Sequence, residues 1–489
     1  MKLEFHGHDE RYTVEQSLLN LFPGELPVYE PIRPGDETWA IISCREDGDF
    51  HVTVKLSWRG KLVPYDYACP LEGTEYERER RRRHAVGACF FLAYRALTGN
   101  EPPWGMLTGV RPDKLVTEAL QAGLAPGEAK TLLERDYFVS PGRAALALKT
   151  GTAAFEAAKS LSPRDIAVYI GVPFCPTRCA YCSFVSQSVE KSFSLVGPYV
   201  EALVTEIEDG GRMVQETGLH VRAMYMGGGT PTTLAAPQLD RVLTAFETAF
   251  GSALDSCGEI TVEAGRPDTI TAEKLAVLKG HGVDRVSINP QTMEEHVLRA
   301  IGRRHSPGDI ETAMNLAVKC GFPHVNMDLI AGLPEDTPEG FRRSLERCLH
   351  FGTDNITVHT LALKKGSRIL LEGLSIPGPE AVGEMLDYAE PALERAGYAP
   401  YYLYRQKYMS GSFENIGWTR PAGECLYNIY IMSELCSILS FGAGGSTKMV
   451  DPARRLIQRR FNPKYPKEYT ERRSKLRSNQ ADFAAFYAR

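Results

Sequence analysis

The sequence lacks the features of membrane and secreted proteins. Its 489 residues contain no long uninterrupted apolar run, and the most apolar late stretch, residues 427–445, is broken by Asn428, Glu434 and several glycines. That stretch cannot supply the ~20 consecutive apolar residues of a membrane-spanning helix. The first 16 residues carry charges throughout, so no signal peptide is expected. We therefore expect a cytoplasmic protein without a membrane span.

The chain also lacks a large excess of charge of either sign. Its 56 Lys and Arg face 61 Asp and Glu, a net charge of −5, which argues against a general nucleic-acid binder. With 43% hydrophobic and 24% charged residues the composition is that of a globular protein, and disordered, collagen-like and disulfide-scaffold classes are excluded. Two stretches are locally basic: the run ERERRRRH at 77–84, which we expect to be a solvated helix face with Glu–Arg pairs, and residues 451–489, with eleven Lys and Arg against four Asp and Glu. This tail could attract an anionic ligand, although a solvated charged surface is the commoner meaning.

A fourth cysteine is missing from the one place where cysteines gather. Cys175, Cys179 and Cys182 share the short segment GVPFCPTRCAYCSF at 171–184, and the next cysteine along the chain is Cys257. In a reducing compartment, clustered cysteines indicate metal binding or catalysis rather than disulfides. Three thiolates can hold three irons of a [4Fe–4S] cluster, whereas an electron-transfer cluster takes four cysteines. The open iron would accept an exogenous ligand, as a catalytic cluster requires.

Two other interpretations of this cysteine loop are less favoured. A structural zinc site needs four ligands, and no His or further Cys stands at a suitable spacing. Three inert thiols in one loop would be a rare coincidence in a chain with 11 Cys. The other eight cysteines are scattered and are expected to be ordinary buried thiols: Cys44, Cys69, Cys89, Cys257, Cys320, Cys348, Cys425 and Cys436.

The chain has three regions that differ in their pattern of apolar and helical segments. Residues 1–162 combine strand-like runs with a helical pattern around 76–97 and predict an α+β domain. In residues 163–364, short apolar runs alternate with helical segments, which is typical of βα units around a parallel sheet. Six units fall short of a closed eight-stranded barrel, so we expect an open, partial (β/α)6 barrel. Residues 365–489 predict a mixed α/β extension that ends in the basic tail. The six expected strands are 167–172, 223–228, 259–264, 285–290, 324–330 and 355–360.

Polar residues and glycines follow the expected strands at their carboxyl ends, where barrel active sites are built. The cysteine loop follows the first strand, and MGGGTPT at 226–232 ends the second. Its glycines let the backbone approach a ligand closely and expose amide donors. Glu263, Gln291 and Asp328 accompany the next three strands. Taken singly, each of these three residues could equally well cap a helix or form an ordinary hydrogen bond within a loop. Together they lie at the same open end of the expected barrel, which favours a shared site.

These motifs resemble those of radical S-adenosylmethionine (SAM) enzymes and, more narrowly, the oxygen-independent coproporphyrinogen III oxidase family. The similarity runs from about Tyr169 to Lys448 and rests on the C-x-x-x-C-x-Tyr-C loop, GGGTPT and the six βα units. The segment WGMLTGVRPDKL at 104–115 resembles the HemZ branch, whose members are called coproporphyrinogen dehydrogenases. Residues 365–489 would then be a HemN-like C-terminal domain.

The resemblance implies roles for individual residues. Cys175, Cys179 and Cys182 would ligate the [4Fe–4S] cluster, and SAM would bind the open iron. One SAM molecule is implied, or two as in some relatives, and no catalytic side chain is implied beyond the cluster. An electron entering the cluster would cleave SAM to a 5′-deoxyadenosyl radical. The implied SAM contacts are Tyr169, Gly228, Gly229, Thr230, Glu263, Gln291, Arg303, Asp328 and the backbone near Ala362.

The resemblance also implies a reaction. In this family the radical removes hydrogen from a substrate propionate, and loss of CO2 and one electron leaves a vinyl group. Two rounds convert coproporphyrinogen III to protoporphyrinogen IX in anaerobic haem biosynthesis, with a small electron donor such as flavodoxin or ferredoxin. The four substrate carboxylates need cationic partners, for which Arg266, Arg304, Arg405 and the basic tail are candidates.

One position departs from the oxidase pattern. The best-studied oxidase branch has a further Cys two residues after the third cluster cysteine, where this sequence has Phe184. The form CSF is closer to that of the related haem-chaperone branch. A haem-binding chaperone and another radical SAM modification of a tetrapyrrole are therefore alternative functions. The extra N-terminal domain favours the oxidase, because the chaperone begins close to its first barrel strand.

Overall fold

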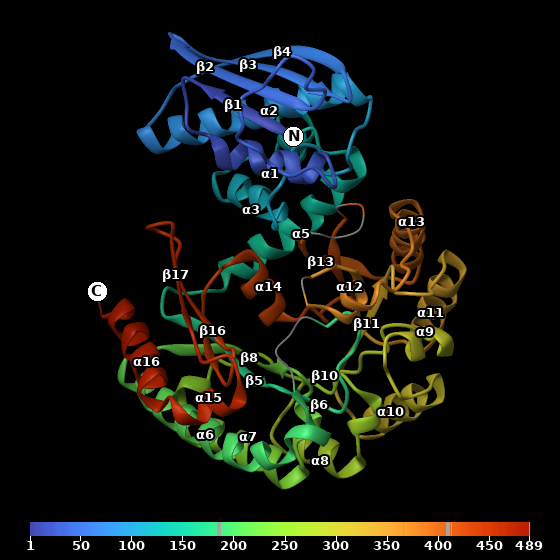
Figure 1. The fold of residues 1–489 in the computed structure, drawn as a ribbon. Coiled ribbons are helices and arrows are strands. Elements are labelled where there is room, and N and C mark those ends of the chain that lie inside the picture. Colours follow the sequence, from blue (N-terminus) through green and yellow to red (C-terminus); the bar gives the residue numbers. More distant parts are fainter. Residues whose placement is uncertain (183–186, 365, 407–410, 412, 489) are drawn as a thin grey trace. The chain divides into compact units, whose positions relative to one another are not determined.

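The structure, a computed structural model, describes residues 1–182, 187–364, 366–406, 411 and 413–488. Phe184 therefore lies outside the described residues. The chain divides into two compact units, unit 1 (Met1–Leu148) and unit 2 (Lys149–Arg489) (Figure 1). No helix in the described part of the chain is long and apolar enough to cross a membrane.

Unit 1 is an α+β domain, as the sequence predicts. Its sheet has the order β1-β2-β3-β4, with β1 parallel to β2 and the other neighbours antiparallel. Side chains of two helices, among them Val14 and Phe90, pack on inward-facing strand residues such as Val52 to form one core. The elements are β1 (Lys2–His6), α1 (Arg11–Leu21), β2 (Trp39–Asp47), β3 (Asp49–Trp58), β4 (Lys61–Pro70), α2 (Glu75–Thr98), α3 (Asp113–Gln121) and α4 (Pro126–Asp136).

In helix α2 the local sequence determines where the helix begins and where it ends. The Thr74 hydroxyl accepts from the Glu77 N–H, and the Glu77 carboxylate accepts from the Thr74 N–H, which is a capping box. The helix ends at Gly99, whose φ of 74° is the left-handed conformation that glycine adopts without strain. Its arginine run is a solvated face with Arg–Glu pairs such as Arg83–Glu79 at the i,i+4 spacing.

Unit 2 is built on an open sheet whose six central strands are the predicted ones. In the described residues the sheet has 11 strands in the order β13-β14-β12-β11-β10-β9-β8-β5-β15-β16-β17. The strands from β12 to β5 in that order are mutually parallel, which confirms the partial (β/α) barrel. These strands are β5 (Asp165–Val172), β8 (His220–Gly228), β9 (Ile260–Glu263), β10 (Arg285–Ser287), β11 (His324–Ala331) and β12 (Asn355–Thr360).

The C-terminal region adds strands to both edges of this sheet. β15 pairs in parallel with β5, and β16 and β17 follow as antiparallel neighbours. At the other edge β14 is antiparallel to β12, and β13 is antiparallel to β14. The added strands are β13 (Ala399–Tyr404), β14 (Asn415–Thr419), β15 (Ser437–Phe441), β16 (Ser446–Asp451) and β17 (Leu456–Phe461).

Helices cover the convex face of the curved sheet, while α14 lies on the concave side (Figure 1). Tyr427 and Tyr430 of α14 pack against Ala167 of β5 and Ala223 of β8, so this helix fills the barrel interior below the strand ends. The helices of unit 2 are α6 (Val189–Glu216), α7 (Ala236–Phe250), α8 (Ala272–Gly280), α9 (Glu295–Ala300), α10 (Pro307–Lys319), α11 (Pro338–His350), α12 (Arg368–Glu372), α13 (Pro379–Arg395), α14 (Leu426–Ser433), α15 (Pro466–Glu471) and α16 (Arg473–Tyr487); α5 (Pro141–Lys159) spans the division between the units.

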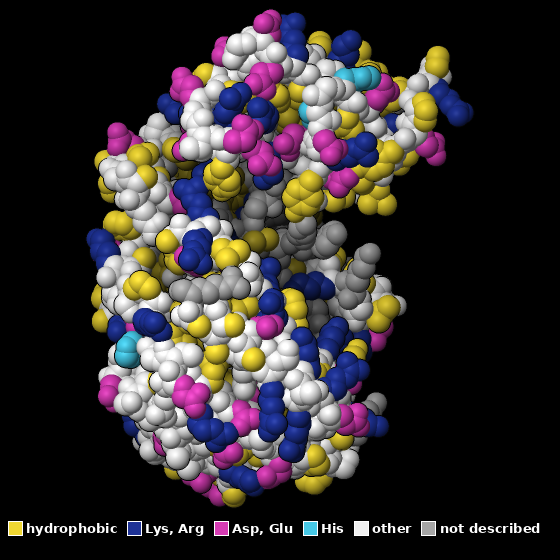
Figure 2. Space-filling model, turned by 90° about the vertical axis from the view of Figure 1, so that its left-hand side faces the viewer, with side chains coloured by type: hydrophobic (Ala, Val, Ile, Leu, Met, Phe, Trp, Pro, Cys, Tyr) yellow, Lys and Arg dark blue, Asp and Glu magenta, His cyan; other side chains and the backbone are white. Residues whose placement is uncertain are grey.

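The basic tail forms β17, α15 and α16. Several of its cations are paired with acidic side chains: Arg460 with Asp482 at 2.6 Å, Arg459 with Glu434 at 3.5 Å, and Arg477 with Asp209 at 3.4 Å. Figure 2, seen from the side of α16, accordingly shows blue and magenta side chains interspersed over unit 2. The tail is a charged surface of mixed sign rather than a concentrated cationic site.

Candidate functional site

The cysteine loop leaves the sheet at the carboxyl end of β5. Cys175 lies in the two-residue strand β6 (Phe174–Cys175), which pairs with β7 (Gln187–Ser188). The Cys182 N–H donates to the Cys179 carbonyl at 3.1 Å, so these two residues close a tight turn. Cys179 is buried, and Cys175 and Cys182 are half-buried. The loop therefore carries one cysteine on β6 and two on the turn that follows it, at the carboxyl end of β5.

The glycine-rich segment after β8 supports this loop. The Gly229 N–H donates to the Val172 carbonyl at 2.8 Å, and the Thr230 N–H donates to the Phe174 carbonyl at 2.7 Å. A Cβ on Gly229 would lie 2.5 Å from the Phe174 oxygen, so only glycine permits this approach. The Thr230 hydroxyl lies 3.4 Å from Cys175 Sγ. These two amides are thus bonded within the protein instead of being exposed as donors, because the cysteine loop occupies the space beside them.

Two buried arginines flank the cysteine loop. Arg266 Nη1 donates to the Thr177 carbonyl at 3.3 Å and lies 4.0 Å from Cys179 Sγ. Arg303 donates to the Tyr181 hydroxyl at 3.2 Å and to the Asn289 carbonyl at 2.5 Å. Burial lowers the pKa of Arg303, but its electrostatic interactions and hydrogen bonds with Tyr181 and Cys179 outweigh burial and raise that pKa above its ordinary value. The Arg303 guanidinium therefore stays charged beside the cysteine loop.

This donor set fits the predicted iron–sulfur cluster. Among the residues that the structure describes, no three His, Cys, Asp or Glu side chains converge where a single metal ion could bind. In a [4Fe–4S] cluster each thiolate binds its own iron, so the three sulfurs need only surround a common volume. Arg266 and Arg303, 2% and 5% exposed, place two cationic side chains against the loop that carries these sulfurs. The other eight cysteines are thiols, of which Cys89, Cys348, Cys425 and Cys436 are buried and the rest half-buried.

A tyrosine–glutamate pair lies on the inner face of the barrel. Tyr169 and Tyr225 are register partners on β5 and β8, and both stack with Tyr427 of α14. The Tyr225 hydroxyl donates to Glu263 Oε1 at 2.7 Å, and burial raises the pKa of Glu263 to about 7. A Cβ at Gly227 would lie 2.9 Å from this carboxyl group, so the glycine makes room for it. Glu263 can therefore change its charge near neutral pH.

Gln291 and Asp328 are brought together by the backbone. The Gln291 N–H donates to the Asp328 carbonyl at 2.9 Å, and Gln291 has a φ of 69°, a left-handed conformation that costs a non-glycine residue free energy. Its buried Oε1 has no hydrogen-bond partner in the described part of the chain. An orphaned acceptor at a strained position is the kind of group that a ligand satisfies.

Asp328 is an ionised carboxylate of the same region. Burial raises the pKa of Asp328. Two neighbours lower it: His359, 3.7 Å away, and the Asn326 amide, which donates to Oδ1 at 2.8 Å. The lowering effects are the larger, so the pKa lies below its ordinary value. Asp328 therefore carries a negative charge at neutral pH. Ala362 lies two residues beyond β12 and is half-buried.

The three candidate arginines for substrate carboxylates lie in different surroundings. Arg266 is held by Asp268 and the cysteine loop. Arg304 is exposed and pairs with Glu190 at 2.7 Å. Arg405 directly follows β13 and is 6% exposed, and burial lowers its pKa to about 10. The structure does not gather them into one cationic site.

Sequence inspection assigned no role to Tyr225, Asn289 or Tyr181, although Tyr181 is the tyrosine of the C-x-x-x-C-x-Tyr-C motif. Tyr225 could have been found from the two-residue period of a strand, which places its side chain on the same face of β8 as Gly227. Tyr181 stands inside the cysteine loop itself. Asn289 could not be found from a pattern, because its role is a backbone carbonyl that accepts from Arg303.

An open parallel sheet with a three-cysteine loop at its carboxyl edge, followed by polar groups on successive strands, defines a radical SAM protein. The family model described as the radical SAM superfamily matches residues 169–348. The solved structure of coproporphyrinogen III oxidase (HemN) from Escherichia coli is 23% identical, covers 66% of this chain and 72% of its own, and has a TM-score of 0.53. That likeness shows a shared fold.

Curated relatives narrow the family. The oxygen-independent coproporphyrinogen-III oxidase-like protein HemZ of Bacillus subtilis is 35% identical over 96% of this chain and 95% of its own length. Heme chaperone HemW of Mycobacterium tuberculosis is 30% identical over 62% of this chain and 73% of its own. Heme chaperone HemW of E. coli is 25% identical over 63% of this chain and 76% of its own length. The chain belongs to the radical SAM superfamily and, within it, to the family of oxygen-independent coproporphyrinogen III oxidases. Membership implies a [4Fe–4S] cluster and SAM.

Proposed function

We propose that this protein is a radical SAM oxidoreductase that converts coproporphyrinogen III to protoporphyrinogen IX in anaerobic haem biosynthesis. The observation that carries the proposal is the similarity to a HemZ oxidase-like protein over 96% of the chain, because that span includes unit 1. The similarity to the two chaperones named above covers 62% and 63% of the chain. We expect the protein to act in the cytoplasm, where thiols stay reduced.

In this proposal Cys175, Cys179 and Cys182 hold the cluster, and SAM binds the remaining iron. Together they supply one-electron reductive cleavage of SAM and hydrogen abstraction from carbon, chemistry that no side chain performs. In the substrate, the bond between a propionate chain and its carboxylate breaks, CO2 leaves, and one electron passes to a one-electron acceptor. A small donor of the flavodoxin or ferredoxin kind would reduce the cluster. We propose at least one SAM molecule per chain.

The chain's own residues would bind and orient SAM. Glu263, oriented by Tyr225, offers a carboxylate to the cationic amino-acid end or sulfonium of SAM. Gln291 offers its buried, unpartnered Oε1, and Asp328 offers a charged carboxylate held by Asn326. The remaining proposed SAM contacts are Gly228, Gly229, Thr230 and Ala362 at or just after strand ends, Tyr169 within β5, and Arg303 after α9.

Among the arginines, we propose Arg405 as a partner for a substrate carboxylate. β13 runs in the same direction as β12, since both are antiparallel to β14. The last residue of β13, Tyr404, is the register partner of Asn415, whose Oδ1 accepts from the Thr360 N–H at the end of β12. Arg405 therefore lies at the same carboxyl edge of the sheet as the cluster loop. A buried guanidinium there can recognise a carboxylate with two parallel hydrogen bonds.

The test is an anaerobic reaction with the reconstituted full-length protein, coproporphyrinogen III, SAM and a chemical reductant. We expect 5′-deoxyadenosine, CO2 and, in sequence, one and two vinyl groups per tetrapyrrole, measured by chromatography and mass spectrometry. Arg405→Met should raise the KM for the substrate, while Arg343→Met, a surface arginine on α11, should not. SAM cleavage without a vinyl product would instead indicate another radical SAM modification.

A haem chaperone is the second candidate, and Phe184 favours it because the best-studied oxidase branch has Cys at that position. The two functions give different results in the same preparation. Tight stoichiometric binding of haem, with no vinyl product and no CO2, would support the chaperone and contradict the oxidase. Replacing Phe184 with Cys should then leave haem binding intact.

A further inference from the structure

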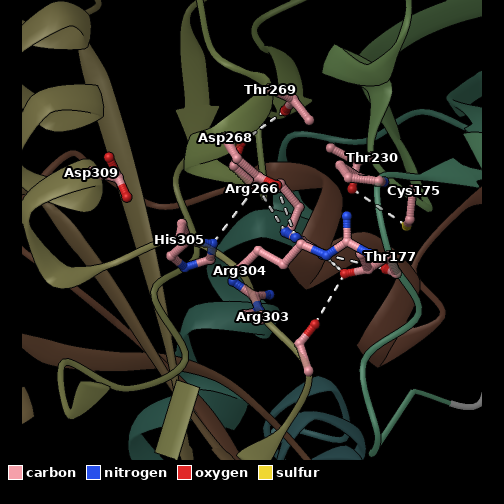
Figure 3. Close-up of polar contacts among 12 residues, drawn as sticks. Cys175, Thr177, Thr230, Arg266, Asp268, Thr269, Arg303, Arg304, His305 and Asp309 are labelled. Atoms are coloured by element: carbon pink, nitrogen blue, oxygen red, sulfur yellow. Dashed lines mark hydrogen bonds and ion pairs between the residues drawn. The ribbon is translucent and has the colours of Figure 1, made fainter. Parts of the chain in front are cut away.

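Arg266 reaches from the carboxyl end of β9 to the middle of the cysteine loop. Its side chain is 3% exposed. Nη1 donates to the carbonyl and the hydroxyl of Thr177 at 3.3 and 3.1 Å, and to Cys179 Sγ at 4.0 Å. One buried cation thus contacts the segment between the first and second cluster cysteines, as the dashed lines to Thr177 in Figure 3 show.

The opposite side of the guanidinium is held by Asp268. Arg266 Nε and Nη2 donate to the two carboxylate oxygens of Asp268, each at 3.0 Å. Asp268 lies in turn 3.7 Å from Nδ1 of the buried His305. The Thr269 hydroxyl donates to the Arg266 carbonyl at 2.7 Å. A bidentate pair fixes both the position and the plane of a guanidinium. Asp268 therefore holds the Arg266 side chain in the orientation in which Nη1 faces the cysteine loop.

This geometry changes the role that the sequence suggests for Arg266. Turning toward a substrate carboxylate would break the hydrogen bonds to Thr177 and leave Asp268 without its bidentate partner. Asp268 is partly exposed, so the cost of such a turn falls on Arg266, whose 3% exposed guanidinium would give up both its bidentate carboxylate and its hydrogen bonds to Thr177. Arg266 is therefore committed to the loop rather than available to the substrate.

A cation beside a cluster sulfur has an electrostatic consequence. Reduction adds one negative charge to an iron–sulfur cluster, and a nearby positive charge stabilises that state. Cluster potentials depend on net charge and on hydrogen bonds to the sulfurs. The negative charge of Asp268 acts in the opposite sense. It lies on the Nε and Nη2 side of the guanidinium, whereas Nη1 is the atom that contacts Cys179 Sγ.

We propose that Arg266 is a positioning residue for the cluster loop and that its charge raises the reduction potential of the cluster. This inference rests on the proposed cluster at Cys175, Cys179 and Cys182. Its consequence is that electron entry, the step before any substrate chemistry, is tuned from β9 by the Arg266–Asp268 pair.

The test is a redox titration of the anaerobically reconstituted full-length protein without substrate, followed by visible absorbance and electron paramagnetic resonance. Arg266→Gln should lower the ratio of reduced to oxidised cluster at the wild-type midpoint about tenfold, equivalent to about 59 mV for one electron. Arg266→Lys, which keeps the charge, should shift it less. Asp268→Asn should shift it the other way, because a negative charge is removed. Arg241→Gln, a surface arginine on α7 paired with Glu201, is the matched control and should not change it.

Opposite shifts for Arg266→Gln and Asp268→Asn separate an effect of charge from a disordered loop. Shifts of the same sign in both, or an unshifted Arg266→Gln, would overturn the inference. If Arg266→Gln fails to fold, Asp268→Asn and Arg266→Lys still decide the question by the direction and size of their shifts. A wild-type protein that binds no iron would contradict the proposed function and this inference with it. A loaded wild type with unshifted variants contradicts the inference alone.

Discussion

At the scale of single residues, the site is a set of charges whose states are determined by their surroundings. Arg303 stays cationic although it is buried, and Asp328 stays anionic. The pKa of Glu263, about 7, lets this carboxyl group gain or lose its proton near neutral pH. Strongly shifted pKa values with identified partners in one cleft are typical of functional sites. The sequence predicted which residue types stand here, but their charge states depend on neighbours such as Tyr225 and His359 that come from other strands.

Tyr225→Phe tests the Tyr225–Glu263 hydrogen bond. That bond lowers the pKa of Glu263, so its loss should raise the pKa further above about 7. Because the ionised carboxylate attracts cationic SAM, SAM affinity should rise with pH through the neutral range, and the midpoint should move to higher pH in the variant. Loss of about 1 kcal/mol would weaken binding roughly fivefold near pH 7. Calorimetric titration of cluster-loaded protein measures this, with Tyr398→Phe, whose hydroxyl contacts the Thr353 carbonyl, as the control. A pH profile that does not move would contradict the role of Tyr225.

Cys179→Ser tests the cluster ligands. A serine hydroxyl is not ionised at neutral pH and cannot replace the thiolate, so bound iron, sulfide and visible absorbance should fall to a small fraction of the wild-type values. Cys348→Ser, at another buried thiol on α11, should keep them. Unchanged iron content in Cys179→Ser would rule out this loop as the cluster site.

At the scale of elements, periodic patterns predicted the six barrel strands, because apolar runs between helical segments report burial on both faces of a parallel sheet. The prediction was poorest at β10. This strand ends at Ser287 rather than at the expected residue 290, and the chain then turns into the strained Gln291. The placement of β15 beside β5 could not be predicted, since their sequence separation carries no periodic signal.

Glu206 on α6 joins several of these elements. Its carboxyl group accepts from the Gly442 N–H at 2.8 Å, from the Asn462 amide at 2.8 Å and from the Tyr469 hydroxyl at 2.5 Å. Burial raises the pKa of Glu206 to about 7, although these hydrogen bonds lower it. The group thus binds a proton more tightly in the folded chain than in the unfolded one.

The sign of the pH effect follows from this raised pKa. The contribution of Glu206 to stability is fully present below its unfolded pKa near 4.5 and is lost as pH rises through about 7, a change of order 3 kcal/mol. The free energy of unfolding of Glu206→Gln, measured with urea, should therefore lie farthest below wild type near pH 5 and approach it near pH 8. Glu201→Gln, an exposed residue of the same helix, is the control. A difference independent of pH would contradict the raised pKa.

At the scale of the whole molecule, the strands of the expected barrel, 163–364, and of the expected C-terminal domain, 365–489, belong to one sheet. β15 pairs with β5 from Ser437 to Phe441, and the Tyr199 hydroxyl bridges the Gly171 carbonyl and the Ala443 N–H. The C-terminal region therefore lies directly beside the strand from which the cysteine loop departs. We propose that residues 163–364 and 365–489 unfold together, whereas unit 1 has its own core.

Two truncations test this organisation. A chain that ends at residue 434 keeps the three cysteines and every proposed SAM contact but loses everything from β15 to α16. One edge of β5 is then unpaired, and the Tyr199 hydroxyl, which donates to the Gly171 carbonyl, loses its own donor, the Ala443 N–H. We expect it to lose cooperative unfolding and most of its iron binding. A chain of residues 141–489, which keeps α5 whole, should retain both, because the core of unit 1 is separate. Iron content after anaerobic reconstitution and circular dichroism during heating measure the two properties. Full iron binding in the chain ending at 434 would show that the barrel alone shapes the site, and loss of iron from 141–489 would show that unit 1 is needed to form it.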